Sequence, residues 1–341
     1  MSDKQSSAQV ENGSKPQKRG CCGFFKRFWW AILLVLIAII VLVVCIIIFV
    51  AVPKIAQQKV NQAKLEIQGV RLAQASANRF RVDINSTITT DGKIKGDIDA
   101  FPGILYLTDA GDEVPFMNVS FPPTTADKFQ TVNISQEVEI GDHDAFNRFT
   151  TYFFDNETLR VSLEGRTKVK AHGLSKKFGV DFKKTVELKG LNAFKGTTVS
   201  GGSILIKPEN GANFKAVSHI PNPSVFSLDI GNTTFASNID GNDIGNLTIQ
   251  NLFIVPGNND FPVTANLNQA KIINLVTGPK YCETGDVPVN LQGNSVLNNG
   301  EHLRYYELAL ASESQTVNMN IAAIIKSSLN VTIACLGSKS G

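Results

Sequence analysis

The sequence has few of the residues from which catalytic and metal sites are built. Its 341 residues include four histidines and five cysteines, and no two histidines stand at metal-ligand spacing. The HExxH and CxxC motifs are absent, as are a phosphate-binding glycine loop and the G-x-S-x-G turn of serine hydrolases. Asp142-His143-Asp144 is interpreted as a polar turn before a short helix. We therefore expect no enzyme, no cofactor and no metal site. A hydrolase whose residues meet only in the fold is the alternative.

The sequence also lacks an excess of basic charge beyond its first 27 residues. The formal net charge is +3, and residues 1–27 carry six basic residues against Asp3 and Glu11, which is +4. The remaining chain therefore sums to −1, because 3 − 4 = −1. A folded part without a basic excess gives no sign of a nucleic-acid partner.

One stretch, residues 28–52, contains no charged residue over 25 positions. A helix of that length covers about 37 Å, against about 30 Å for a bilayer core. We predict a retained transmembrane helix, since the apolar core of a cleaved signal peptide is shorter. Residues 1–27 are predicted to be a disordered basic cytosolic tail by the positive-inside rule, and residues 53–66 a helical stalk.

The five cysteines divide by position. Cys21 and Cys22 precede the apolar stretch beside Lys26 and Arg27, which is typical of S-palmitoylation sites, although an unmodified reduced pair is an equal alternative. Cys45 lies within the stretch. The two that remain, Cys282 and Cys335, are predicted to form one disulfide in an oxidising lumen.

Seven Asn-x-Ser/Thr sequons that follow the apolar stretch support a lumenal location for the folded part. They are Asn85, Asn118, Asn133, Asn156, Asn232, Asn246 and Asn330. The alternation of the predicted strands places Asn85, Asn133 and Asn330 on solvent-facing sides, where a glycan would not disturb the core.

Beyond residue 66 the hydrophobic period is two, which indicates half-buried strands. Phe80, Val82 and Ile84 begin the first strand, Asp91-Gly92 predicts a hairpin to a return strand near residues 94–98, and residues 329–335 predict a last strand with Cys335 facing inward. Short helices are expected at 143–152, 268–276 and 321–327. The fold class is therefore all-β after one transmembrane helix.

A weak internal repeat divides the β region. The segment beginning at Val161 resembles the segment beginning at Val289, and a Gly- and Ser-rich link covers residues 196–202. We predict two tandem β-sandwich domains, residues 67–195 and 203–337, that share a core or an edge. Accidental similarity of strand patterns is the alternative.

The densest charge run is residues 159–189, with nine basic and three acidic residues. Two strands around the turn at His172 are predicted to form a hairpin. Its outer face would contact anionic headgroups or an acidic partner through Lys168, Lys170, Lys183 and Lys184. The alternative is a solvated face whose lysines discourage strand pairing.

Two motifs carry a family resemblance. The anchor followed by Pro53-Lys54-Ile55-Ala56 and alternating strands resembles fungal single-pass membrane proteins with a lumenal domain of unknown function. His219-Ile-Pro-Asn-Pro-Ser-Val-Phe-Ser-Leu-Asp-Ile-Gly-Asn232, with Pro256-Gly-Asn-Asn259, resembles the late-embryogenesis-abundant type-two-like β-domain. Ser224 replaces the last Asn of that family's Asn-Pro-Asn turn. The resemblance implies a sandwich or half-open barrel with an apolar groove. It also implies lipid binding in some relatives and vacuolar signalling in one.

The predicted function is a membrane-anchored lumenal protein that binds or transfers lipid at its own membrane. The alternative is a glycosylated structural or interaction ectodomain with a protein partner. The expected location is the vacuole, endoplasmic reticulum or plasma membrane, with a cytosolic N-terminus.

Overall fold

The computed structural model describes residues 22–109, 111 and 113–335, without the side chains of residues 22–28 and 32. It divides into two compact units, Met1–Ile55 and Ala56–Gly341. Most of the tail predicted at 1–27 and the palmitoylation candidate Cys21 lie outside the described residues. Cys22 begins the first helix, but its side chain is not described. Palmitoylation of this pair stays a prediction.

The apolar stretch is helical. It comprises α1 (Cys22–Ile46), a π-helical turn η1 (Ile47–Ala51) and α2 (Val52–Gln62). From Trp29 to Gln62 this rod of 34 residues is long and apolar enough to cross a membrane or act as a signal anchor. The Val52 N–H bonds to the Ile47 carbonyl five residues earlier, as in a π-helix. This π-helical turn directly precedes Pro53, which has no N–H to donate.

The predicted stalk is shorter than expected. Residues 53–66 were assigned to it, but α2 ends at Gln62 and strand β1 begins at Lys64. The helix of this stalk is held to the β region by side chains. The Lys59 ammonium lies 2.5 Å from the Asp91 carboxylate, and the Gln57 amide pairs with the Asp181 backbone at 2.7 and 2.8 Å.

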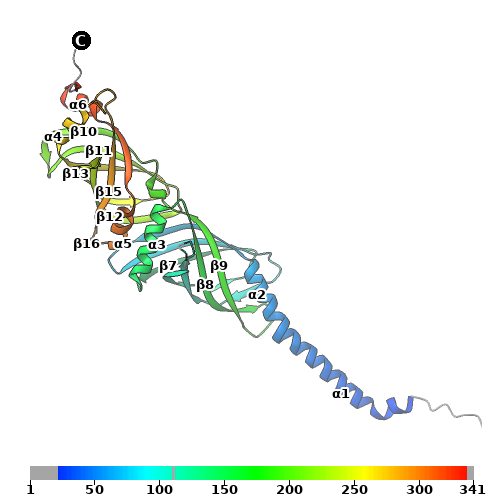
Figure 1. Ribbon diagram of the computed structural model, residues 1–341. Helices are drawn as coiled ribbons and strands as arrows, with labels where there is room; N and C mark the ends of the chain where they lie inside the picture. The colour runs from blue at the N-terminus through cyan, green and yellow to red at the C-terminus, as the bar shows by residue number, and fades with distance from the viewer. Residues whose placement is uncertain (1–21, 110, 112, 336–341) are drawn as a thin grey trace, which may run out of the picture. The chain divides into compact units, whose positions relative to one another are not determined.

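Two antiparallel-rich sheets build the larger unit (Figure 1). The eleven strands of the first sheet are β1 (Lys64–Ala73), β2 (Arg79–Thr89), β7 (Phe129–Glu139), β10 (Thr198–Glu209), β11 (Ala212–Asn222), β12 (Phe226–Ile239), β13 (Asn242–Ile254), β14 (Gly257–Leu267), β15 (Asp286–Asn298), β16 (Glu301–His302) and β17 (Gln315–Asn320). The six strands of the second are β3 (Gly96–Ile98), β4 (Phe101–Leu107), β5 (Val114–Phe121), β6 (Thr124–Thr125), β8 (Thr158–Ala171) and β9 (Phe178–Lys189). The chain is thus mostly β, as predicted.

The first sheet joins both halves of the chain. Its order is β10-β11-β14-β13-β12-β1-β2-β7. The start of β12 pairs in parallel with β1, with Val70 opposite Phe226, whereas its later part pairs with β15. Strands assigned to both predicted sandwich domains therefore share one sheet. The largest core cluster likewise runs from Val70 to Leu310. Two separate domains are not confirmed.

Helix α3 (His143–Asp155) supplies the aromatic centre of that core. The ring of Phe149 stacks on that of Phe116 in β5, with ring centroids 3.9 Å apart. The ring centroids of Phe153 and of Phe226 in β12 lie 4.5 Å apart. The helix starts where Asp142 accepts a hydrogen bond from the Ala145 N–H at 2.9 Å. Asp142-His143-Asp144 is accordingly a capped helix start. No cluster of metal-ligating side chains occurs among the described residues.

The three predicted helices are present as α3, α4 (Gln269–Val276) and α6 (Ile321–Leu329). A fourth, α5 (Arg304–Ser312), was missed. It begins after Leu303, which makes no side-chain cap, so the sequence carries no helix-start signal there. Its buried face holds Tyr305 and Tyr306, and burial raises the pKa of both phenols.

Two strand predictions were wrong. The hairpin at Asp91-Gly92 does not form, because β2 pairs with β1 and β7 while β3 belongs to the second sheet. The Asp-Gly pair is a local signal for a turn. The partner of β2 is instead β7, with which it pairs along its whole length from Arg79 to Thr89. The last strand, 329–335, is also absent. There α6 ends at Leu329, and Asn330 caps it with a φ of 55°.

The contact between α3 and α5 gives a pH-dependent prediction. Partial burial raises the pKa of Asp155, whose carboxylate accepts a hydrogen bond from the Ser312 hydroxyl at 2.6 Å. Its charged form is therefore disfavoured in the fold. This cost is present above the folded pKa and disappears below the unfolded pKa.

We expect Asp155→Asn to raise the free energy of unfolding at neutral pH, because the amide still accepts the Ser312 bond. The gain should vanish in acid. Urea midpoints at the two pH values measure it. As a control, Asp144→Asn removes a negative charge from the first turn of α3 and should be destabilising at neutral pH. A stabilisation by Asp155→Asn that persists unchanged in acid would contradict the explanation.

Candidate ligand-binding cavity

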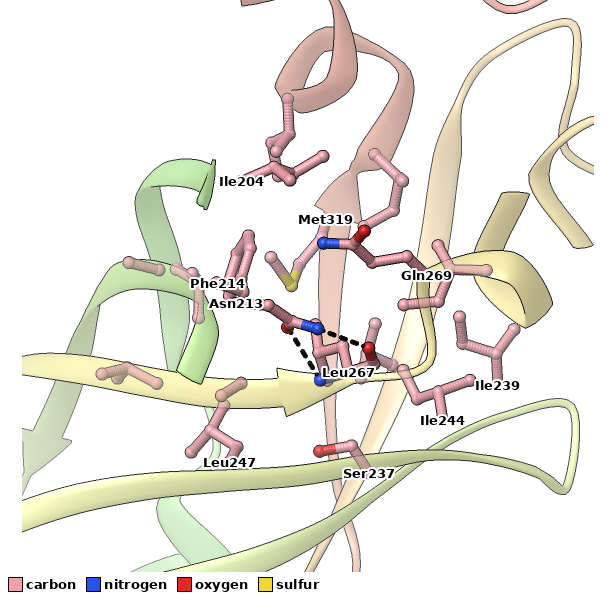
Figure 2. A pocket seen from close by; sticks show the side chains of 18 of the residues that line it. Ile204, Asn213, Phe214, Ser237, Ile239, Ile244, Leu247, Leu267, Gln269 and Met319 are labelled. Atoms are coloured by element: carbon pink, nitrogen blue, oxygen red, sulfur yellow. Dashed lines mark hydrogen bonds between the residues drawn. The ribbon is translucent and has the colours of Figure 1, made fainter. Parts of the chain in front are cut away.

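An apolar cavity of ≈ 100 Å³ lies inside the larger unit. Its walls come from β10–β15 and β17 of the first sheet and from helices α4 and α6 (Figure 2). Of its 23 lining residues, all but Asn213, Ser237 and Gln269 are apolar. No lining residue is ionisable, so the cavity offers no charge to a ligand.

Small side chains on the inner sheet face make the space. Phe214 and Ala216 of β11 face inward, as do Val263 and Ala265 of the paired strand β14. Alternation predicts inward apolar residues here. Two alanines in neighbouring strands leave room that larger residues would fill.

Helix α6 covers one side of the cavity. Ile321, Ile324 and Ile325 line it at helical spacing. The helix is capped by Asn320, which accepts from the Ala323 N–H at 2.7 Å, and the Ser328 hydroxyl accepts from the Ile204 N–H of β10 at 3.0 Å. Gly202 lets β10 approach, since an added Cβ would lie 2.7 Å from the Ile324 Cδ1 atom.

The cavity opens beside the two helices. Ile273 of α4 and Leu329 of α6 line it, yet they are 46% and 38% exposed. Gln269, at the start of α4, is exposed as well. The lining near these residues therefore reaches solvent, whereas the lining on β12 is buried.

Two of the three polar lining residues, Asn213 and Ser237, differ in their hydrogen bonding. Asn213 is satisfied, because its side chain makes both hydrogen bonds of a pair with the Leu267 backbone at 2.8 and 2.9 Å (Figure 2). Ser237 of β12 is 2% exposed and its hydroxyl has no hydrogen-bond partner among the described residues. A buried hydroxyl without a partner is unfavourable and needs an explanation.

The predicted disulfide is confirmed and lies next to the cavity helices. Cys282 and Cys335 are bonded across a sequence separation of 53, with Cα atoms 5.2 Å apart. Cys282 follows α4 and Cys335 follows α6. The bond therefore ties the chain after one cavity helix to the chain after the other. Cys45 is free.

The sequon asparagines fall into two groups. Asn85, Asn118, Asn133, Asn246 and Asn330 are exposed. The other two are half-buried and bonded to backbone: the Asn156 amide donates to the Tyr152 carbonyl at 3.0 Å, and Asn232 accepts from the Asn251 N–H at 2.9 Å. Asn232 also lines a polar depression of ≈ 310 Å³ with Arg71 and Asp229. Glycosylation at all seven stays a prediction.

The predicted basic hairpin exists, but its four lysines do not share one face. Strands β8 and β9 pair with Glu164 opposite Lys183 and Leu163 opposite Lys184. Consecutive residues of a strand point to opposite sides, so Lys183 joins Lys168 and Lys170 while Lys184 lies on the inner face. There it donates to the Asn61 carbonyl at 2.8 Å, and burial lowers its pKa.

Acidic neighbours further reduce the basic character of the outer face. Lys183 bonds to Glu164 and lies 3.6 Å from Glu113, and Arg166 lies 3.0 Å from Asp181. Glu164 and Asp181 already belong to the count along residues 159–189, but Glu113, which directly precedes β5, lies outside it. The count along the sequence therefore overestimates the local positive charge. The geometry favours a solvated face.

The Asn-Pro motif serves the fold. Between β11 and β12, the Asn222 side chain donates to the Phe226 carbonyl at 2.7 Å and accepts from the Ser224 N–H and hydroxyl at 2.9 and 2.6 Å. Asn259 similarly accepts from the Val255 N–H at 2.8 Å. Both asparagines are buried, so their amides hold turns.

One side-chain constellation was missed from the sequence. The Ser200 hydroxyl lies 2.6 Å from Nε2 of His219, whose Nδ1 lies 2.6 Å from a carboxylate oxygen of Asp260. This is the atom order of a serine hydrolase triad. The residues come from the neighbouring strands β10, β11 and β14, so no linear motif could reveal them. They lie on the outer face, and none of them lines the apolar cavity.

Comparisons with known proteins give little about activity. Residues 114–237 match the model of a family described as a protein of unknown function, DUF3712, so the chain contains a DUF3712 domain. No curated protein matches. Among solved structures, the red sea bream transglutaminase crystal structure is similar at 13% identity and a TM-score of 0.22, over 72% of this chain and 30% of that chain. This likeness is too low to support an argument.

Proposed function

We propose that this protein binds lipid in the apolar cavity that α4 and α6 line on one side. The observation that carries the proposal is an uncharged, apolar space that remains inside the unit and reaches the surface beside two helices. Protein interiors normally pack without voids larger than a water molecule. Each CH₂ group of a chain that enters such a space contributes about 0.8 kcal/mol.

The N-terminal apolar helix supports the proposal because it would place the cavity near membrane lipid. A helix able to span a membrane keeps the protein at a lipid source. We further propose that the N-terminus is cytosolic and that the larger unit is lumenal, in the vacuole, endoplasmic reticulum or plasma membrane. A disulfide and five exposed sequon asparagines support an oxidising, glycosylating compartment. We also propose that the β region is related to late-embryogenesis-abundant type-two-like domains and contains two of them in tandem.

Lipid analysis of the full chain tests the proposal. The protein is extracted in detergent-free polymer discs, so that no detergent competes for the cavity, and its lipids are compared with those around residues 1–55 alone. We expect at least one lipid species to be enriched only with the full chain. Equal lipid content would refute lipid binding. A stoichiometric protein partner without lipid enrichment would favour the interaction ectodomain instead.

We also propose that the chain is not an enzyme, which makes the Ser200 constellation testable. A triad needs a substrate site and oxyanion donors near the nucleophile, but Ser200 lies on the outer sheet face, away from the cavity. We expect no labelling of the protein by a fluorophosphonate probe, and unchanged lipid content in Ser200→Ala. Labelling of the wild type that disappears in Ser200→Ala would show a nucleophilic serine and contradict this expectation.

A further inference from the structure

The buried Ser237 hydroxyl distinguishes the cavity from an ordinary packing defect. Ser237 lies in the inward row of β12 with Phe235 and Ile239, at 2% exposure, and it lines the cavity. Most buried hydroxyl groups in proteins have a partner. Ser86 is a comparable buried serine of this chain, and its hydroxyl donates to the Val132 carbonyl at 2.9 Å.

We propose that the cavity takes an uncharged lipid with a hydroxyl or carbonyl group, and that this group hydrogen-bonds to Ser237. The inference rests on the proposed function. It names the ligand class, because a hydroxyl can both donate to a carbonyl and accept from an alcohol. The apolar part of the ligand would contact the isoleucines of α4 and α6 and extend toward the exposed side chains Ile273 and Leu329.

The lining also excludes a charged head group from the interior. No lysine, arginine or histidine lines the cavity, so a carboxylate or phosphate placed beside Ser237 would be buried without a counter-charge. Burying an unpaired charge is strongly unfavourable. By charge, a fatty alcohol or a neutral ester suits this uncharged lining better than an ionised fatty acid.

Photolabelling of the full chain in membranes tests the inference. Three probes carry the same diazirine and alkyne groups on dodecanol, dodecane and dodecanoic acid, and mass spectrometry measures labelling of α6 and β11 peptides. In the wild type we expect the alcohol to label these peptides about tenfold more than the hydrocarbon, the size of one added hydrogen bond to a buried group. The acid should label them less than the alcohol.

Variants assign the preference to Ser237. Ser237→Ala should bring the alcohol-to-hydrocarbon ratio close to one without reducing labelling by the hydrocarbon. Ser237→Thr keeps the hydroxyl and should retain the preference. Ser227→Ala, on the same strand but outside the cavity lining, is the matched control and should behave as the wild type.

The outcomes separate this inference from the proposed function. Equal labelling of the wild-type cavity by alcohol and hydrocarbon would overturn the hydrogen bond between ligand and Ser237 and leave apolar binding intact. An ordered water that occupies the Ser237 hydroxyl would give this result. Labelling of no cavity peptide by any probe would overturn the proposed function itself.

Stability measurements provide a readout that needs no ligand. Ser86→Ala removes a hydrogen bond and should lower the thermal midpoint of the ligand-free protein. Ser237→Ala removes a hydroxyl without a partner and should not lower it. An equal loss in both variants would show that Ser237 is already satisfied, and would overturn the inference.

Discussion

Replacing Ala216 with Phe should abolish lipid binding while leaving the protein folded. Ala216 of β11 is 6% exposed and lines the cavity, so a ring attached there occupies the space that a ligand needs. Exclusion of even two CH₂ groups, at about 0.8 kcal/mol each, lowers affinity about tenfold. Lipidomics of the purified chain and labelling by an apolar probe measure the loss.

The same substitution tests whether the space is empty in the free protein. Extra atoms in a filled core cost about 1–3 kcal/mol. Here the ring enters an existing cavity of ≈ 100 Å³, so we expect a smaller loss of stability. Ala270→Phe is the matched control, because Ala270 is exposed on α4 and does not line the cavity. Unchanged lipid content in Ala216→Phe would rule out this cavity as the binding site.

Removal of the disulfide should cause the largest loss of stability. The bond between Cys282 and Cys335 closes a loop with a sequence separation of 53, which corresponds to about 4 kcal/mol in the chain-entropy treatment. Beyond α6 the described residues form no strand or helix, so no sheet pairing holds residues 330–335 in place of the bond. We expect the Cys282→Ser, Cys335→Ser double variant to unfold at a clearly lower temperature.

Lipid binding should weaken in the same variant, because α6 forms one wall of the cavity. Treatment of the wild type with a reducing agent should reproduce both effects. Cys45→Ser is the control, since Cys45 lies in helix α1 and has no disulfide partner. A double variant with wild-type stability and lipid content would show that packing alone holds α6.

The helices show what sequence signals can and cannot locate. The three that were predicted each begin after an Asp or Asn whose side chain accepts from the backbone three residues later, at Asp142, Asn268 and Asn320. Helix α5 begins after Leu303 without such a cap. Capping is a local interaction and is visible in the sequence, whereas α5 is stabilised by the burial of Tyr305 and Tyr306 against distant elements.

The strands were largely predictable from alternation, but their partners were not. A period of two fixes which residues face the core and leaves the neighbouring strand undefined. The cavity was equally hidden, since inward apolar residues occur in a filled core and in a hollow one. One local signal was available: Ser237 interrupts the inward row of Phe235 and Ile239. The Ser200 constellation depends on three strands and had no such signal.

The parallel pairing of β1 with β12 has a consequence for biosynthesis. Val70 lies opposite Phe226, so β1 must wait for 226 − 70 = 156 further residues before its partner exists. At ordinary synthesis rates this takes about 8–30 s. During that interval one edge of β1 stays unpaired, and unpaired strand edges promote aggregation. Chains that stop before residue 226 should therefore depend on folding helpers, and completion of the chain should end that dependence.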